Sequence, residues 1–194
     1  MKIALIVAIV MAAIFLLLRY FSLKRDKDDK DALEKAYLAK DYEKYLRIVN
    51  YRIDIAKDVR DKNILATLKM PIYHETRDWQ KLQALYEQVD TKKLPKATKL
   101  SFLCHYITGL YLSGDFALAN AFVTKNRRFL QEGEGNSRYQ LYLDGFLAFQ
   151  QFYAENYANA KERFLTLKEN KVTNRFYQGV YDEFLEKIEA KIKE

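Results

Sequence analysis

Two histidines and one cysteine are the side chains of this 194-residue sequence with the widest chemical repertoire. His105 follows Cys104 directly, and His74 lies in an earlier segment. A thiol and an imidazole can act as nucleophile and base, but adjacent positions on a helix point about 100° apart and do not face each other. Neither histidine has a nucleophile or an orienting carboxylate at a recognisable spacing. Catalysis at His74 or His105 is therefore not expected.

Metal and nucleotide sites are not expected either. The sequence has no H-E-x-x-H motif and no Gly-rich phosphate loop. A single cysteine cannot build a disulfide scaffold or a cysteine-based zinc site. Glu132 and Glu134 lie in the Gly-rich segment 132–136, where solvated charge is the plain interpretation. The sequence thus predicts a non-enzymatic protein without a cofactor.

The composition favours a helical protein attached to a membrane. Only 6 Gly and 2 Pro mean few tight turns, which disfavours a β-sandwich or barrel. The 15 Tyr and 12 Phe exclude a disordered linker. One uninterrupted apolar run, residues 3–18, stands apart from a charged remainder. We expect one all-α domain behind one membrane segment.

The apolar run from Ile3 to Leu18 is the expected membrane anchor. Its sixteen residues span roughly 24 Å as a helix, against a hydrocarbon core of about 30 Å. Arg19 can reach the headgroups and Tyr20 suits the interfacial aromatic belt, which extends the usable span. A cleaved signal peptide is the alternative, but bulky residues stand where a small-x-small cleavage site is needed.

Positive charge around this segment sets its expected orientation. Residues 19–30 carry five basic residues, whereas the N-terminal side has Lys2 alone. The positive-inside rule then predicts a single-pass protein with a cytoplasmic C-terminal domain, and an extracytoplasmic domain is the alternative. The expected organisation is a signal anchor over residues 1–22 and a charged juxtamembrane linker over residues 23–30.

The net charge of +7 does not by itself predict nucleic-acid binding. Beyond residue 30 the chain holds 27 basic and 23 acidic residues, with the signs interspersed. The dense basic cluster from Lys125 to Arg128 lacks the ordered basic and stacking pattern that helical-repeat RNA readers need. We expect no nucleic-acid partner.

A short pair of Asp or Asn followed by an aromatic residue recurs four times. The aromatic residues are Tyr42, Trp79, Phe116 and Tyr157, at spacings of 37, 37 and 41 residues. Asp and Asn are preferred helix N-caps, and the aromatic can pack in the angle between the outgoing and incoming helices. The recurrence predicts helix pairs, and periods near 34–40 residues are typical of stacked helical repeats.

This pattern resembles the tetratricopeptide repeat. Gly114–Phe116 followed by Ala119 matches the turn of that family, and Asn156–Tyr157 followed by Ala160 matches it again. The first helices depart from the pattern, because three of them carry large residues where the family has a small one. The resemblance implies an α-α superhelix of about four helix pairs over residues 31–194. An irregular helical bundle is the alternative.

The expected helices follow from these turns and from the apolar periodicity. They run over residues 31–39, 42–55, 61–75, 79–89, 96–112, 116–130, 137–154 and 157–168. Pro71 is expected to kink or split the third of them. From Asn174 onward an apolar stripe continues at a spacing of four: Phe176, Val180, Phe184, Ile188 and Ile192. This predicts a capping helix over the open end of the stack, or alternatively a helix for a partner or membrane surface.

The resemblance also implies a place for a partner, because the first helices of such repeats line a concave groove. The matching positions are His74, Thr108, Tyr111, Leu112, Tyr142, Phe149, Phe152 and Tyr153. Aromatic side chains suit a binding hot spot, and they suit a core equally well. We expect a membrane-anchored adaptor or scaffold that binds a protein or peptide and serves assembly or regulation of a membrane complex. A subunit of a membrane enzyme and an oligomerising structural tether are the alternatives, and the oligomeric state is open.

Overall fold

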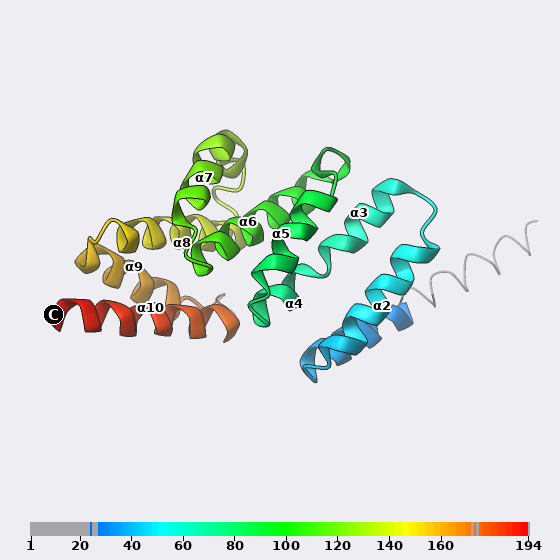
Figure 1. Cartoon of the computed structure of the whole chain (residues 1–194), viewed down its shortest axis with the longest axis horizontal. Coiled ribbons are helices and arrows are strands. Elements are labelled where there is room, and N and C mark those ends of the chain that lie inside the picture. Colours follow the sequence, from blue (N-terminus) through cyan, green and yellow to red (C-terminus); the bar gives the residue numbers. More distant parts are fainter. Residues whose placement is uncertain (1–23, 25–26, 172, 174, 194) are drawn as a thin grey trace, which may run out of the picture. The chain divides into compact units, whose positions relative to one another are not determined.

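The computed structural model describes residues 24, 27–171, 173 and 175–193 (Figure 1). The described residues form helices and no strand, which confirms the all-α class. The expected anchor from Ile3 to Leu18, with Arg19 and Tyr20, lies outside them. Within the part that is described, no helix is both long and apolar enough to cross a membrane. Contacts along the chain define two compact units, Met1–Ala56 and Lys57–Glu194.

The described part of the first unit is a pair of helices. Residues 27–38 form one, and α2 (Tyr42–Ile55) forms the other. Its small core contains Leu33, Ala36, Tyr45 and Val49. The other described side chains of this pair are exposed or half-buried.

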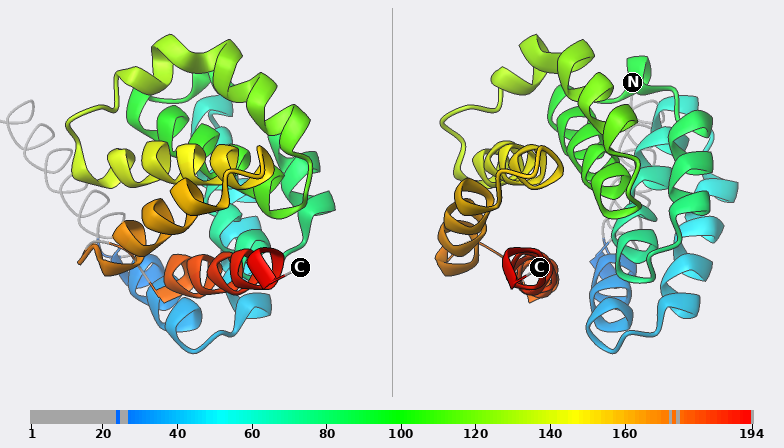
Figure 2. Two further views of the ribbon diagram at one scale, coloured as in Figure 1. Left: turned by 90° about the vertical axis from the view of Figure 1, so that its left-hand side faces the viewer. Right: turned by 60° about the vertical axis from the view of Figure 1, so that its left-hand side comes forward.

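The second unit contains the remaining helices, shown in Figures 1 and 2. They are α3 (Val59–Thr67), α4 (Met70–Glu75), α5 (Trp79–Gln88), the 3-10 helix η1 (Thr91–Lys93), α6 (Lys96–Leu112), α7 (Phe116–Gln131), α8 (Ser137–Tyr153), α9 (Tyr157–Glu169) and α10 (Arg175–Lys193). The helix expected over residues 61–75 is split into α3 and α4. Pro71 lies in the first turn of α4, where its missing N–H has no helical partner to lose.

Four turns share one backbone conformation. In each, the residue before the cap has a positive φ: 57° at Lys40, 53° at Arg77, 87° at Gly114 and 58° at Glu155. In each, the next N–H donates to the carbonyl five residues earlier, as from Asp78 to Tyr73 at 2.9 Å. This pair of features defines a Schellman C-cap. The recurrence of the sequence pair therefore corresponds to a recurrence of geometry.

The residue after each of these positions caps the next helix. Asp41, Asp78 and Asp115 accept hydrogen bonds from first-turn N–H groups at 3.0, 3.1 and 3.3 Å. Asn156 stands at the equivalent place without a side-chain cap bond. One short sequence thus ends one helix and begins the next, which explains why the helix ends were predictable.

The second unit is built by antiparallel neighbours. Helix α7 packs on α6, α9 packs on α8, and α10 lies beside α9 (Figure 2). Gly109 in α6 allows α5 to approach closely, because a Cβ there would lie 2.2 Å from Cδ2 of Leu82. Helix α6 is deeply buried along much of its length, and Ile107 and Tyr111 have no exposed surface.

Candidate functional site

The eight predicted groove residues divide by burial. His74, Thr108, Tyr111 and Phe149 are buried, and Leu112, Tyr142, Phe152 and Tyr153 are half-buried. They come from α4, α6 and α8. The structure brings most of them together in two neighbouring groups, one aromatic and one polar, and Leu112 lies at the end of α6.

The aromatic group joins α6 to α8. The Tyr111 ring stacks on Phe149 at 5.1 Å and on Tyr153 at 6.3 Å, measured between centroids. The Tyr153 hydroxyl donates a hydrogen bond of 2.8 Å to the Tyr111 carbonyl oxygen, and Tyr111 donates one of 2.6 Å to Asn120 Oδ1. Burial raises the pKa of Tyr111 to about 12, so its hydroxyl stays protonated.

Helix α10 covers this aromatic group. The Phe184 ring lies 5.0 Å from Phe149 and 4.9 Å from Phe152. It also lies 5.4 Å from Phe164 of α9. Edge-on and tilted ring contacts of this kind fill space between helices. Two of the rings predicted to receive a partner, Phe149 and Phe152, therefore contact the C-terminal helix of the same chain.

The polar group connects four helices. The His105 ring of α6 lies between two tyrosine hydroxyls, 3.1 Å from that of Tyr142 in α8 and 3.3 Å from that of Tyr177 in α10. His74 Nε2 in α4 lies 2.7 Å from the His105 carbonyl oxygen. Because that carbonyl only accepts, Nε2 of His74 carries the proton.

His74 is buried as a neutral imidazole. Desolvation lowers its pKa to about 4, even though its bond to the His105 carbonyl favours the charged form. Its Nδ1 atom has no hydrogen-bond partner among the described residues. The Trp79 and Phe176 rings meet the imidazole edge-on, at 5.9 and 6.1 Å. This environment gives His74 a packing role and makes it a weak base.

The Cys104 thiol is likewise a poor nucleophile in this arrangement. Cys104 is fully buried, and burial raises the pKa of its thiol to about 12, so almost no thiolate forms at neutral pH. The described residues contain no group of three or more His, Cys, Asp or Glu side chains that could hold a metal ion. The sequence-based expectation of a non-enzymatic protein stays a prediction.

Ion pairs line both sides of α10. Asp182 pairs with Lys168 of α9 at 2.5 Å, and Glu189 pairs with Lys161 of α9 at 3.2 Å. On the other side, Glu183 accepts a hydrogen bond from Arg77 in the turn after α4. The Arg77 hydrogen bond is the main cause that lowers the pKa of Glu183 to about 2, assisted by Lys187. In these three pairs the acid belongs to α10 and the base to the surface that it covers.

Three of the four aromatic residues of the recurring turns contact first-helix rings. Trp79 lies against His74, Phe116 stacks on Tyr153 at 4.6 Å, and Tyr157 lies 5.8 Å from Phe152. Phe116 remains 43% exposed, and Tyr42 in the first unit is half-buried. Two of these turn residues, Phe116 and Tyr157, thus contact α8 rings next to Tyr111 and Phe149.

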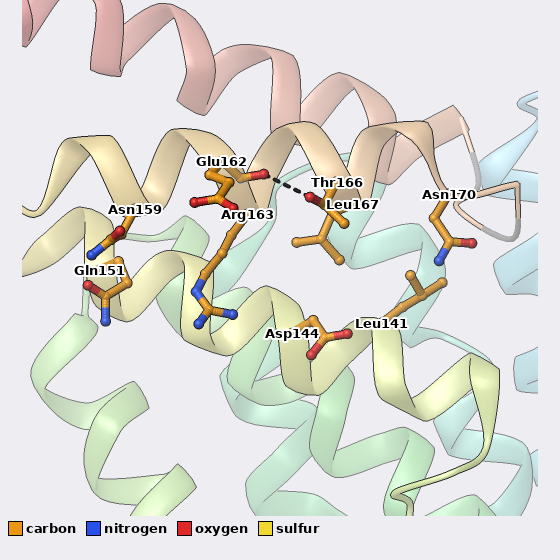
Figure 3. Close-up of a pocket in the computed structure, with 9 residues that line it drawn as sticks. All are labelled: Leu141, Asp144, Gln151, Asn159, Glu162, Arg163, Thr166, Leu167 and Asn170. Carbon is orange, nitrogen blue, oxygen red and sulfur yellow. Dashed lines mark hydrogen bonds between the residues drawn. The ribbon is translucent and has the colours of Figure 1, made fainter.

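A separate cleft of about 440 Å³ lies between α8 and α9 (Figure 3). It is lined by Leu141, Asp144, Gln151, Asn159, Glu162, Arg163, Thr166, Leu167 and Asn170. Figure 3 shows the Arg163 side chain extending across it toward α8. Its lining combines carboxylates, a guanidinium and amides. This combination of acidic, basic and neutral groups does not favour one class of ligand.

Sequence reasoning considered His105 only as a candidate for catalysis, and it missed the contact of His105 with Tyr142 and Tyr177 and the cleft. Tyr142, His105 and Tyr177 come from three different helices, so their meeting depends on packing that periodicity does not encode. No protein-family model matches the chain, and neither the curated proteins nor the solved structures contain a significant match. The resemblance to the tetratricopeptide repeat stays a prediction.

Proposed function

We propose that the chain is a membrane-tethered, tetratricopeptide-like scaffold. It binds a helical segment of a protein partner along the surface that α10 now covers. One observation carries this proposal: that surface already holds an amphipathic helix, with Phe184 seated among Phe149, Phe152 and Phe164. A surface shaped for one helix fits another of the same chemistry. The tether raises the effective concentration of the scaffold toward other membrane proteins.

Occupation by α10 makes partner binding a competition. The buried side chains of the α10 stripe include Val180, Phe184 and Ile188. Each contributes up to about 1.5–3 kcal/mol through burial. A segment of the same chain also acts at an effective concentration of the order of millimolar. A partner must therefore bind better than α10, or α10 must first be weakened, which keeps the scaffold closed until the right partner is present.

A structural tether is the second candidate, and the burial of α10 itself favours it. If α10 is a permanent part of the core, the aromatic group serves stability alone. Partners then contact other surfaces of the protein. The two candidates differ in one property, which is whether the surface under α10 accepts a helix supplied from outside.

That property is measurable on the full chain in lipid nanodiscs. A fluorescein-labelled peptide of residues 175–193 is titrated against the wild type and against Ile188→Asp, which places a charge at a fully buried position of α10. The scaffold predicts saturable binding that is at least tenfold tighter for Ile188→Asp. Ile192→Asp is the matched control, because Ile192 is 60% exposed.

Two further measurements keep this test decisive. Circular dichroism at 222 nm checks that Ile188→Asp retains the helices outside α10. If Ile188→Asp loses these helices, Glu183→Arg is used instead to displace α10, because this change places a second positive charge beside Arg77. A folded, opened chain that does not bind the peptide supports the structural tether and contradicts the scaffold.

A further inference from the structure

We propose that the partner segment is an acidic amphipathic helix that lies antiparallel to α9, with two carboxylates seven residues apart. This inference rests on the scaffold function proposed above. It adds the chemistry, direction and register of the partner, which follow from the basic groups around the surface under α10.

The first step is the spacing of the ion pairs along α9. Asp182 pairs with Lys168, and Glu189 pairs with Lys161. The two acids are seven residues apart on α10, and the two lysines are seven residues apart on α9. The order is reversed between the helices, so these pairs form the two rungs of an antiparallel ladder. Seven residues are close to two helical turns, which keeps each set on one face.

The second step is the opposite side of α10. Glu183, next to Asp182 in sequence, points to Arg77 in the turn after α4. Adjacent helical positions diverge by about 100°, so this third acid is held on a different face from the ladder. A basic group on each side of the apolar stripe fixes the rotation of the helix about its axis. A basic partner helix would meet like charge on both sides.

The third step is the apolar surface between these charges. Phe176 lies edge-on to His74, and Phe184 lies among three rings two turns further along. Phe176 and Phe184 are eight residues apart, with Val180 buried midway. A helix that replaces α10 must present large apolar side chains at this spacing. The combination of an aromatic stripe with flanking carboxylates favours an acidic protein helix over a phosphate-rich ligand.

The individual ion pairs are half-exposed, so each adds little affinity alone. The side chains of the ladder pairs are 40–54% exposed. Exposed pairs of this kind contribute modestly to stability, whereas like charges placed opposite each other are repelled. The ladder therefore acts mainly in selectivity, by rejecting helices with the wrong charge pattern or the wrong direction.

A charge-reversal experiment on the full chain in nanodiscs tests this proposal. The Ile188→Asp chain is compared with the same chain carrying Lys161→Glu and Lys168→Glu. Each is titrated with two labelled peptides of residues 175–193, one of native sequence and one with Asp182→Lys and Glu189→Lys. We expect the groove reversal to weaken the native peptide about tenfold and to restore binding of the reversed peptide.

A matched control separates the ladder from general charge effects. Lys125→Glu with Arg128→Glu on α7 changes the net charge of the chain by the same amount, at two exposed positions. This control is expected to change the affinity of both peptides less than twofold. An equal effect of the control and the groove reversal would contradict the proposal.

The remaining outcomes distinguish the proposal from the function on which it rests. If the opened chain binds both peptides equally well before and after the groove reversal, the ladder proposal is wrong and the scaffold function stands. If no opened chain binds either peptide, the scaffold function fails and the ladder proposal fails with it. If the wild type is a dimer in light scattering and Ile188→Asp makes it monomeric, the occupant is α10 of a second copy, which also contradicts a partner helix.

Discussion

Glu183 of α10 accepts a hydrogen bond from Arg77, more than a hundred residues earlier in the chain. The contact joins the C-terminal helix to the turn after α4. No motif or periodicity in the sequence links the two residues. Side-chain contacts of Phe176, Tyr177 and Phe184 also bring α10 against α4, α6 and α8, the helices that carry the predicted groove residues. The covering of this surface by α10 therefore depends on contacts between distant parts of the chain.

Removing the charge of Glu183 should loosen α10 at neutral pH. The pKa of this carboxyl is lowered to about 2 in the folded chain, from 4.5. A lowered carboxyl pKa stabilises the folded state above pH 4.5, and this contribution disappears as the pH falls toward 2. Because both side chains are partly exposed, we expect Glu183→Gln to lower the free energy of unfolding by about 1 kcal/mol at pH 7.

Urea unfolding of the two proteins at pH 7 and near pH 2 measures this difference. The two curves should converge at the lower pH. Glu186→Gln is the matched control, because Glu186 is an exposed acid on the same helix. A destabilisation by Glu183→Gln that persists at low pH would show that the charge is not the cause.

The burial of His74 predicts a second pH-dependent loss of stability, at a higher pH than the loss that involves Glu183. The pKa of His74 is lowered to about 4, from 6.5, so between these values the unfolded chain binds a proton that the folded chain excludes. The stability of the folded state therefore falls as the pH drops from 6.5 toward 4. Between pH 7.5 and pH 5 the loss should be about 2 kcal/mol.

His74→Gln tests this prediction, because a glutamine amide can still donate to the His105 carbonyl without titrating. Urea unfolding at pH 7.5 and pH 5 should show a smaller pH dependence for the variant than for the wild type. An unchanged pH dependence would mean that another group is responsible.

The recurring turns predict that introducing glycine at one equivalent position and removing it from another change stability in opposite directions. Glu155 has a φ of 58°, where a side chain is strained and glycine is not. Glu155→Gly should raise the free energy of unfolding by about 0.5–1 kcal/mol, and Gly114→Ala should lower it by about 1 kcal/mol. Thermal melts of both variants measure the two shifts. Equal signs would contradict the shared turn geometry.

The close approach of α5 and α6 predicts a cost for any side chain at Gly109. A Cβ there would meet the buried Leu82 side chain, so Gly109→Ala should destabilise the fold by about 1–3 kcal/mol. Gly179→Ala in α10 is the matched control, since its Cβ would meet nothing within 4 Å. This control should stabilise slightly, through higher helix propensity. Comparable melting temperatures for the two variants would contradict the packing of α5 on α6.

The helix ends could be predicted because local chemistry fixes them. Asp41, Asp78 and Asp115 cap the helices that the sequence assigned to them, and α2 and α6 begin and end at the expected residues. The split between α3 and α4 followed from Pro71. These features depend on a few neighbouring residues, so a sequence pattern carries them.

The state of the site could not be predicted in the same way. The apolar stripe of α10 is evident in the sequence, which also predicts a capping helix. The contacts of α10 with α9, His74 and Arg77 depend on long-range packing. The sequence favours neither an open aromatic groove nor a filled one. Periodicity identifies an apolar face, and it does not identify which element covers that face.

Orientation in the membrane is the remaining sequence-based prediction with a direct test. The excess of basic residues after Leu18 predicts a cytoplasmic C-terminus. A reporter fused after residue 194 that is active only outside the cytoplasm should stay inactive, and one active only inside should be active. The reverse result would place the domain on the other side.

The binding of the 175–193 peptide by the full-length Ile188→Asp chain tests the central claim most directly. Fluorescence anisotropy in nanodiscs should give saturable binding at least tenfold tighter than for the wild type, with Ile192→Asp unchanged from the wild type. A folded Ile188→Asp chain that binds the peptide no better than the wild type would contradict a partner-binding surface beneath α10.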